Sequence, residues 1–240
     1  MDPETIKLIF GIIGTILATF FYISPAVPCY KLYKGELNHR NYPGILLACS
    51  LFNCILWFVY GIELNELMVY VANSSGAIIT ELWLLCYIYY YAEQNLLYGI
   101  VFNVEILLSL IGILLVFHYP IHNPDTTGKV AMIFNTLMYA APGEKMFTVY
   151  KTNNYKILPI STSICGVLCS TSWLIYGIYL GDISMIFPNA LGVVFAVLQI
   201  IVFIIAYNRA KTQGILKVDD GKGSAPLVKE DEQKEEKVDV

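Results

Sequence analysis

Two asparagine and two tryptophan side chains stand out because they lie in runs that are otherwise apolar. Trp57 precedes Asn73 by 16 residues, and Trp173 precedes Asn189 by the same interval. An asparagine amide offers two hydrogen-bond donors and an acceptor oxygen, and tryptophan offers a flat apolar face with one indole donor. These groups suit an uncharged polyol. Asparagine also bonds helix to helix, however, and tryptophan also anchors at membrane interfaces.

Residues that carry catalytic or metal chemistry are not arranged for it in this sequence. It contains neither HExxH nor GxSxG, and the three histidines, His39, His118 and His122, have no zinc spacing. The cysteines form no CxxC pair, and we interpret them as small buried apolar residues; they are Cys29, Cys49, Cys54, Cys86, Cys165 and Cys169. We therefore expect no enzyme activity, no cofactor and no metal.

The elements that must position these side chains are membrane-spanning helices. Of the 240 residues, 57% are apolar and only 14% are charged, whereas a soluble domain carries about a quarter charged residues. A transmembrane helix needs about 20 mostly apolar residues. Seven stretches meet this requirement: 6–28, 43–62, 67–91, 97–118, 128–150, 157–179 and 184–207. The sequence therefore predicts an all-α membrane protein with seven transmembrane helices.

Lysine and arginine at the helix ends indicate the orientation, because cytoplasmic loops collect them. One side has Lys31, Lys34, Arg40, Lys145, Lys151, Lys156, Arg209 and Lys211, and the other has only Lys7 and Lys129. The N-terminus is thus expected outside and the C-terminus in the cytosol. We expect residues 208–240 to form a disordered cytosolic tail, because eight acids and four lysines fall in its last 22 positions. The net charge of −4 mostly describes this tail, so nucleic acid is excluded as a partner.

An internal repeat organises the chain. A shift of 116 places residues 43–80 on 159–196 with nine identities among 38 positions, including Trp57/Trp173 and Asn73/Asn189. A shift of 117 aligns Tyr22-x-x-Pro25 with Tyr139-x-x-Pro142. Residues 1–91 are thus a first three-helix repeat, 92–127 a linker helix with its outer loop, and 128–207 a second repeat in the same orientation. This 3+1+3 arrangement of parallel repeats is a transporter architecture.

The sequence resembles the SWEET (saliva-type) sugar transporter family. The resemblance rests on YISP at 22–25, MYAAP at 138–142, TSWLIYG at 171–177 and FPNALG at 187–192, with weaker echoes in LWFVYG at 56–61 and VANSSG at 71–76. It covers residues 6–207. It implies a facilitative sugar uniporter that works by alternating access, and it suggests a homo-oligomer in the lipid bilayer. We expect the plasma membrane, with Golgi or other endomembranes as the alternative.

The resemblance also implies roles for individual residues. Asn73, Asn189, Trp57 and Trp173 would bind the sugar, and the bulk of the two indoles favours a monosaccharide such as glucose. Pro25, Pro43, Pro142 and Pro159 would form a hinge tetrad, although a helix-end role competes for Pro43 and Pro159, which follow loops. Tyr60, Tyr176 and Asp182 would close an outer gate. We expect Gly76 and Gly192 to allow another helix to approach closely, and Pro188 to lie in the first turn of the last helix.

Other functions compete with this interpretation. Glu81 and Glu105 lie within expected spans and keep open a proton-coupled amino-acid transporter of the PQ-loop type. That family's Pro-Gln pairs are absent, because Pro25 is followed by Ala26 and Pro142 by Gly143. A seven-helix receptor fits the span count and the outside N-terminus. It does not explain the repeat, since a receptor has no need of equivalent halves.

Overall fold

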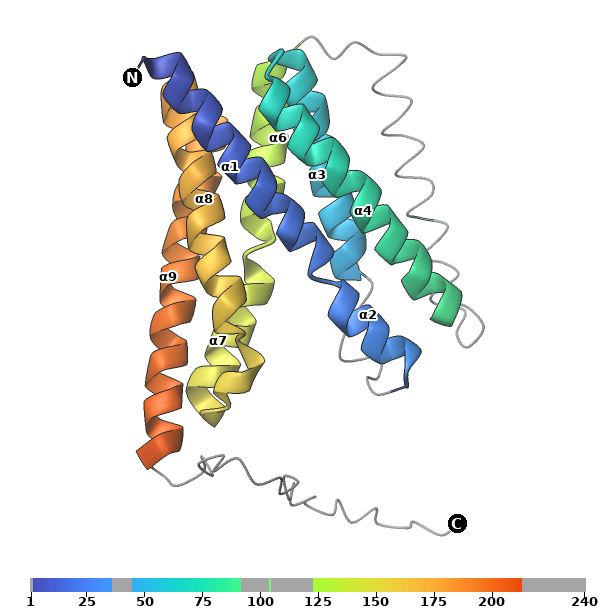
Figure 1. Ribbon diagram of the computed structural model, residues 1–240, viewed down its shortest axis with the longest axis vertical. Helices are drawn as coiled ribbons and strands as arrows, with labels where there is room; N and C mark the ends of the chain where they lie inside the picture. Colours follow the sequence, from blue (N-terminus) through green and yellow to red (C-terminus); the bar gives the residue numbers. More distant parts are fainter. Residues whose placement is uncertain (1, 36–44, 92–103, 105–122, 213–240) are drawn as a thin grey trace.

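The fold is seen in a computed structural model, which describes residues 2–35, 45–91, 104 and 123–212. Helices account for almost all of this part of the chain (Figure 1). The first repeat holds α1 (Pro3–Ile23), α2 (Ala26–Tyr33), α3 (Ile45–Glu63) and α4 (Leu67–Tyr91). The second holds α6 (Pro124–Leu137), α7 (Ala140–Thr152), the short 3-10 helix η2 (Tyr155–Ile157), α8 (Ile160–Leu180) and α9 (Ile183–Thr212).

Five helical segments in the described part are long and apolar enough to cross a membrane: Pro3–Lys31, Leu46–Glu63, Leu67–Ile88, Ile160–Leu180 and Ile183–Thr212. They correspond to five of the seven expected spans. The span expected at 128–150 is divided between α6 and α7, and each of these pieces is too short to cross alone. The span expected at 97–118 lies outside the described residues.

Helix α1 exposes large apolar side chains and buries small ones. On α1 the buried residues are Gly11, Gly14 and Ala18. Large apolar side chains of the same helix point outward, and Phe20 is 63% exposed. In water such a surface would be costly, whereas lipid is as apolar as these side chains, and small residues let helix backbones approach closely. The distribution of side chains therefore supports a membrane protein.

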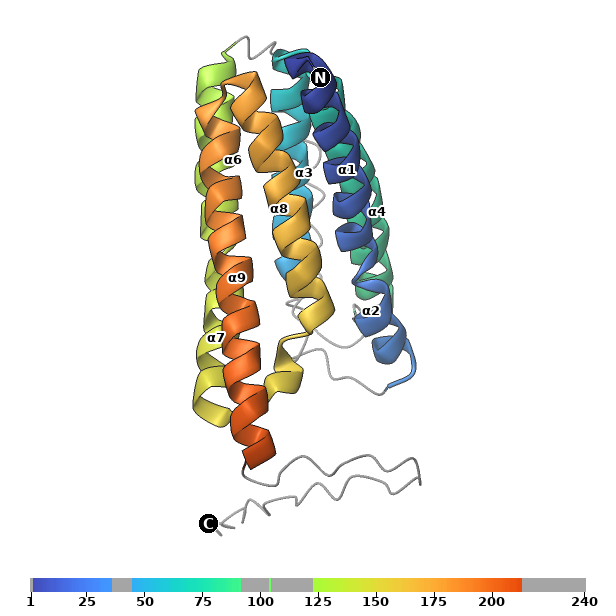
Figure 2. The same cartoon turned by 60° about the vertical axis from the view of Figure 1, so that its left-hand side comes forward.

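The two repeats share one packing pattern. In each, the third helix lies between the other two: α4 contacts α1 and α3, and α9 contacts both α8 and the α6–α7 pair. Across the repeats, α1 packs against α8 and α3 packs against α6. Figure 2 shows α6 and α7 end to end beside α9, with α8 between them and α1. The first helix of each repeat thus contacts the second helix of the other.

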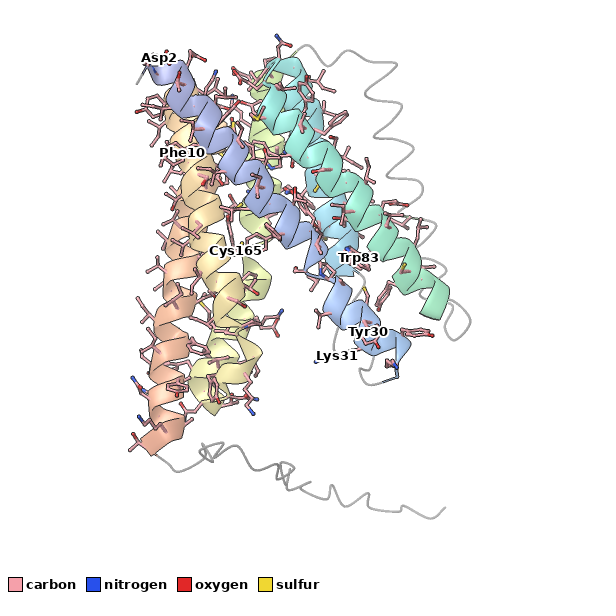
Figure 3. All side chains as sticks on the ribbon, viewed as in Figure 1. Asp2, Phe10, Tyr30, Lys31, Trp83 and Cys165 are labelled. Carbon is pink, nitrogen blue, oxygen red and sulfur yellow. The ribbon has the colours of Figure 1, made fainter. Side chains whose placement is uncertain are left out.

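The turn before the third helix is also shared. Asn65 and Gly181, which the shift of 116 aligns, both adopt a left-handed backbone, with φ of 56° and 72°. Each is followed by an acid that opens the next helix: the carbonyl of Glu66 accepts the Val69 N–H, and the carbonyl of Asp182 accepts the Met185 N–H. Both acids are therefore held at the same end of the molecule. That end also holds Asp2, while Lys31 lies at the opposite end (Figure 3).

The first helix of each repeat is interrupted near its YxxP stretch. Turn residues Ser24 and Pro25 separate α1 from α2, and Met138 and Tyr139 separate α6 from α7. Proline lacks the N–H that a continuous helix needs, and its ring clashes with the carbonyl four residues earlier. The two breaks fall within three residues of one another when the repeats are superposed in sequence.

Three sequence-based boundaries need correction. The second repeat starts at Pro124 instead of 128, because Asn123 caps α6 by accepting the Thr126 N–H and Pro124 suits the first helical position. Residues 208–212 are not part of a disordered tail, because α9 continues to Thr212 with Ala210 only 1% exposed. Pro188 is the sixth residue of α9, so it lies in the second turn and not the first. Residues 213–240 lie outside the described part.

Candidate functional site

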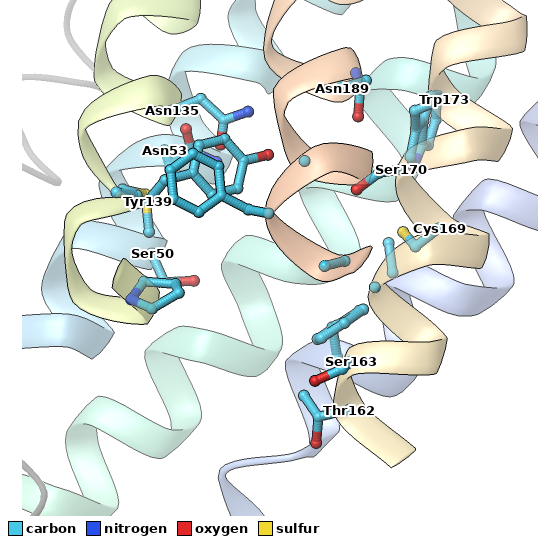
Figure 4. A pocket seen from close by; sticks show the side chains of 18 of the residues that line it. Ser50, Asn53, Asn135, Tyr139, Thr162, Ser163, Cys169, Ser170, Trp173 and Asn189 are labelled. Carbon is cyan, nitrogen blue, oxygen red and sulfur yellow. The ribbon is translucent and has the colours of Figure 1, made fainter. Parts of the chain in front are cut away.

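A cavity of about 550 Å³ lies between the two repeats. Its lining includes all four residues predicted to bind a ligand: Trp57, Asn73, Trp173 and Asn189. They come from α3, α4, α8 and α9, so each repeat contributes one tryptophan and one asparagine. Figure 4 shows Asn189 and Trp173 on one side of the cavity and Asn53, Asn135 and Tyr139 on the other. Among the described lining residues only Lys145 carries a charge, so the walls are polar but largely neutral.

The two predicted asparagines are held in the same way. Nδ2 of Asn73 donates to the Val69 carbonyl at 2.8 Å, and Nδ2 of Asn189 donates to the Met185 carbonyl at 2.8 Å. In both cases the acceptor is four residues earlier on the same helix. The bond orients the amide and uses one of its two donors. One N–H and the amide oxygen of each side chain remain for a ligand in the cavity.

Two further asparagines that the sequence did not single out line the cavity. Asn53 on α3 and Asn135 on α6 both belong to the wall, and Oδ1 of Asn53 is buried without a hydrogen-bond partner in the described structure. A buried acceptor without a partner is costly, which is consistent with a site that a ligand completes. The repeat did not reveal these residues, because Asn53 aligns with Cys169 and Asn135 with Ala18. An amide inside an apolar span was the only available signal.

The two glycines that follow the asparagines allow a tyrosine side chain, not a helix backbone, to approach. A Cβ atom on Gly76 would lie 2.5 Å from the Tyr22 ring, and one on Gly192 would lie 2.5 Å from the Tyr139 hydroxyl. These tyrosines belong to the two YxxP stretches, and Tyr139 donates to the Pro188 carbonyl at 3.0 Å. Each Asn-x-x-Gly unit therefore joins the third helix of a repeat to the break in its first helix.

Two crossed hydrogen bonds lie at the end of the molecule nearest the N-terminus. Tyr60 donates to Asp182 at 2.7 Å, and Tyr176 donates to Glu66 at 2.5 Å. Each bond joins the two repeats, and the two bonds are related by the shift of 116. Both tyrosines and Asp182 were expected at a gate from the sequence. Glu66 was not, although the same shift aligns Glu66 with Asp182.

The rings of the two tyrosines in these bonds pack against glycines that occupy equivalent positions in the two repeats. A Cβ on Gly11 would lie 2.8 Å from the Tyr176 ring, and a Cβ on Gly128 would lie 2.7 Å from the Tyr60 ring. On the cavity side, Trp57 packs edge-on against Tyr60 and Trp173 against Tyr176, with ring centroids 5.6 and 5.4 Å apart. Trp57 is only 6% exposed, so it is not part of a surface aromatic belt. The tryptophans thus form a layer between the cavity and the crossed bonds.

The predicted hinge prolines occupy different local settings. Pro25 lies in the break between α1 and α2, and Pro142 is the third residue of α7 and lines the cavity. Pro159 also lines the cavity, but it is the N-cap of α8, which is the helix-end setting. Pro43 lies outside the described residues. Of the two acids, Glu81 on α4 is not among the described lining residues, and Glu105 lies outside the described part.

Comparison with protein families matches residues 8–95 and 125–211 to the family described as "Sugar efflux transporter for intercellular exchange". The second matched segment begins 117 positions and ends 116 positions after the first, which are the offsets that align the two halves. Together the two segments cover well over half of the chain.

Curated relatives and a solved structure agree with this match. The chain is 28% identical over 215 residues to a bidirectional sugar transporter, SWEET7b, of Oryza sativa subsp. japonica, covering 87% of this chain and 81% of the relative. It is 27% identical over 219 residues to a bidirectional sugar transporter, SWEET10, of Arabidopsis thaliana, covering 89% of this chain and 75% of the relative.

The solved structure of a eukaryotic SWEET transporter superposes with a TM-score of 0.75 at 22% identity, over 86% of this chain and 99% of that one. This likeness confirms the expected fold class, an all-α membrane protein with seven transmembrane helices in a 3+1+3 arrangement. The helical repeats, the shared cavity and the double family match lead to one assignment: the chain belongs to the SWEET family, described as sugar efflux transporters for intercellular exchange.

Proposed function

We propose that the protein is a facilitative, bidirectional sugar uniporter whose substrate binds in the cavity between the repeats. The observation that carries this proposal is the pair of equivalent, equally oriented amides, Asn73 and Asn189, in one cavity with largely neutral walls. Each presents a free donor and a free acceptor, which matches hydroxyl groups that both donate and accept. The relatives named bidirectional sugar transporters support the same substrate class.

We propose a monosaccharide such as glucose as the substrate. Trp57 and Trp173 both line the cavity, and an indole offers an apolar face to the C–H side of a sugar ring. Asn53 and Asn135 add hydrogen-bonding groups from the facing wall. The volume of about 550 Å³ lies in the ordinary range for small-molecule sites. The bulk of two indoles at one end leaves less length for a disaccharide.

Alternating access supplies the transport step. We propose that the crossed bonds Tyr60–Asp182 and Tyr176–Glu66 close the N-terminal end of the cavity in this conformation. The lining continues the other way to Lys145, Leu158 and Pro159. We propose that Pro25, Pro142 and the helix breaks beside them, with Pro43 and Pro159, let helix segments pivot so that one end closes as the other opens.

No chemical step and no cofactor enter this mechanism, and a neutral substrate makes transport insensitive to membrane potential. Proton coupling would need a titratable group that senses the substrate. Glu81 is not among the described lining residues, and Lys145 lies at the far end of the cavity from the tryptophans. We propose that the N-terminus faces the outside of the plasma membrane, that the C-terminus is cytosolic, and that the protein forms homo-oligomers.

Uptake of radiolabelled glucose into liposomes that contain only this protein tests the proposal. We expect saturable uptake without ATP or an ion gradient. Asn73→Ala and Asn189→Ala should each reduce uptake to the level of protein-free liposomes, because a polar ligand loses its oriented partner. Asn208→Ala, an exposed asparagine on the same helix as Asn189, is the matched control and should transport normally. Normal uptake by both cavity variants, or uptake that disappears with the pH gradient, would contradict the proposal.

A further inference from the structure

We propose that Lys7 is a positioning residue that locks the N-terminal gate through Glu66, a role beyond the residues named above for that gate. The inference rests on the proposed function, since a gate has meaning only in a transporter. It concerns one of the two crossed bonds, Tyr176–Glu66. We add Lys7, from a third helix, as a partner of the Glu66 carboxylate in that bond.

The geometry is a chain of three side chains. Nζ of Lys7 on α1 lies 3.2 Å from Oε1 of Glu66, and Oε2 of the same carboxylate accepts the Tyr176 hydroxyl at 2.5 Å. Both charged side chains are 17% exposed, so the ion pair is partly shielded from water. The ammonium also lies 6.0 Å from the centroid of the Tyr176 ring. Lys7 therefore holds one carboxylate oxygen while the other bonds the opposite repeat.

The equivalent bond shows why a lysine is needed on this side only. Oδ1 of Asp182 accepts the Ser184 N–H at 2.9 Å, which caps α9 and leaves Oδ2 for Tyr60. Aspartate is a good N-cap because its short side chain reaches the second N–H of the helix. Glu66 opens α4 in the same way, but its side chain is one methylene longer and bonds Lys7 instead. The backbone orients one carboxylate, and Lys7 orients the other.

A second bond of Lys7 provides an internal control. The same ammonium lies 3.1 Å from Oε2 of Glu4, whose side chain is 79% exposed. An exposed pair of this kind contributes little to stability. Removing Glu4 should leave the gate unchanged, whereas removing Lys7 frees the Glu66 carboxylate to rotate away from Tyr176. The gate should then open more often.

The test measures how fast a membrane-impermeant methanethiosulfonate labels Cys169, which lines the cavity behind the gate. An epitope at the N-terminus shows which face of the membrane carries the gate. The reagent is then added to intact cells or to inside-out vesicles, whichever exposes that face. Other cysteines can also react, so the labelling measured in a Cys169→Ser variant is subtracted from the total. Lys7→Met should raise the labelling rate roughly fivefold, the factor that corresponds to a partly shielded ion pair. Lys7→Arg and Glu4→Gln should label like the unaltered protein.

A double-mutant cycle separates positioning from a general loosening of the fold. Lys7→Met and Glu66→Gln should each accelerate labelling, and the double variant should add little, because both act through one contact. Unchanged labelling in Lys7→Met, or fully additive effects, would overturn the proposal. Glucose uptake by the unaltered protein is measured in parallel. Its absence would overturn the proposed function, while the labelling rates would still decide the role of Lys7.

Discussion

The two repeats place equivalent residues at equivalent points, yet they differ in detail. Asn73 and Asn189 make the same bond to their own helices, and Tyr60 and Tyr176 each bond an acid of the other repeat. Other aligned positions differ: Asn53 faces the cavity where the second repeat has Cys169. The residues common to both repeats make the same hydrogen bonds in each. The unequal ones make the cavity asymmetric, which suits an asymmetric ligand such as the proposed sugar.

The glycines after the asparagines give the largest expected effect. Gly76→Ala would place a Cβ 2.5 Å from ring atoms of Tyr22, so we expect about 2 kcal/mol of destabilisation and loss of uptake. In Gly192→Ala the nearest atoms are the Ser170 and Tyr139 hydroxyl oxygens, both at 2.5 Å. Hydroxyl groups at the ends of side chains yield more easily than an aromatic ring, so the loss should be smaller. Thermal unfolding in detergent measures both variants.

Gly143→Ala is the control for this pair, because its Cβ would meet nothing closer than 3.9 Å. It should be neutral or slightly stabilising, since alanine favours a helix more than glycine does. Equal losses in Gly76→Ala and Gly143→Ala would show that the close approach of Tyr22 is not the cause.

The crossed bonds provide the next comparison. Tyr60→Phe and Tyr176→Phe each remove one hydrogen bond to a carboxylate, and each should weaken the closed gate by about 1 kcal/mol after allowance for partial exposure. The expected result is roughly fivefold faster labelling of Cys169 from the gate side. The two effects should add in the double variant, because the bonds share no side chain. A large effect from only one tyrosine would mean that the repeats do not share the closure.

Asn53→Cys gives the first repeat the residue that the second repeat has at the aligned position, Cys169. Loss of one neutral hydrogen bond to the substrate should raise the KM for glucose about fivefold. Thermal stability should not fall, because the Asn53 amide oxygen has no partner in the described structure. Cys169→Ser, which changes the aligned residue while keeping its size, should alter the KM less. A drop in stability without a change in KM would assign Asn53 to the fold and not to the site.

The smallest effect is expected from Glu66→Asp, which copies the acid of the second repeat into the first. The shorter side chain can cap α4 as Asp182 caps α9, while its link to Lys7 is lost. The two changes oppose each other, so thermal stability should stay within about 0.5 kcal/mol. Labelling of Cys169 should then no longer respond to Lys7→Met. If it still responds, Lys7 acts on the gate by another route.

Part of the site was predictable from residue spacing. The shift of 116 paired Asn73 with Asn189 and Trp57 with Trp173, and all four line one cavity. The same shift pairs Glu66 with Asp182, but two different acids at loop positions carried no signal by themselves. Asn53 and Asn135 have no amide counterpart, so the repeat could not reveal them. Pro188 was placed one turn too early, because apolar periodicity does not locate the first residue of a helix.

The sequence by itself determined the membrane setting, the two parallel repeats and the family, because these depend on composition and on periodic identities along the chain. Only the tertiary structure decided which side chains meet. Lys7, Glu66 and Tyr176 come from separate parts of the chain and join at one end of the molecule. Gly11 and Gly128 are unremarkable as residues until a tyrosine of the other repeat lies against them. Such contacts depend on how helices pack against one another, and spacing within one helix does not encode that.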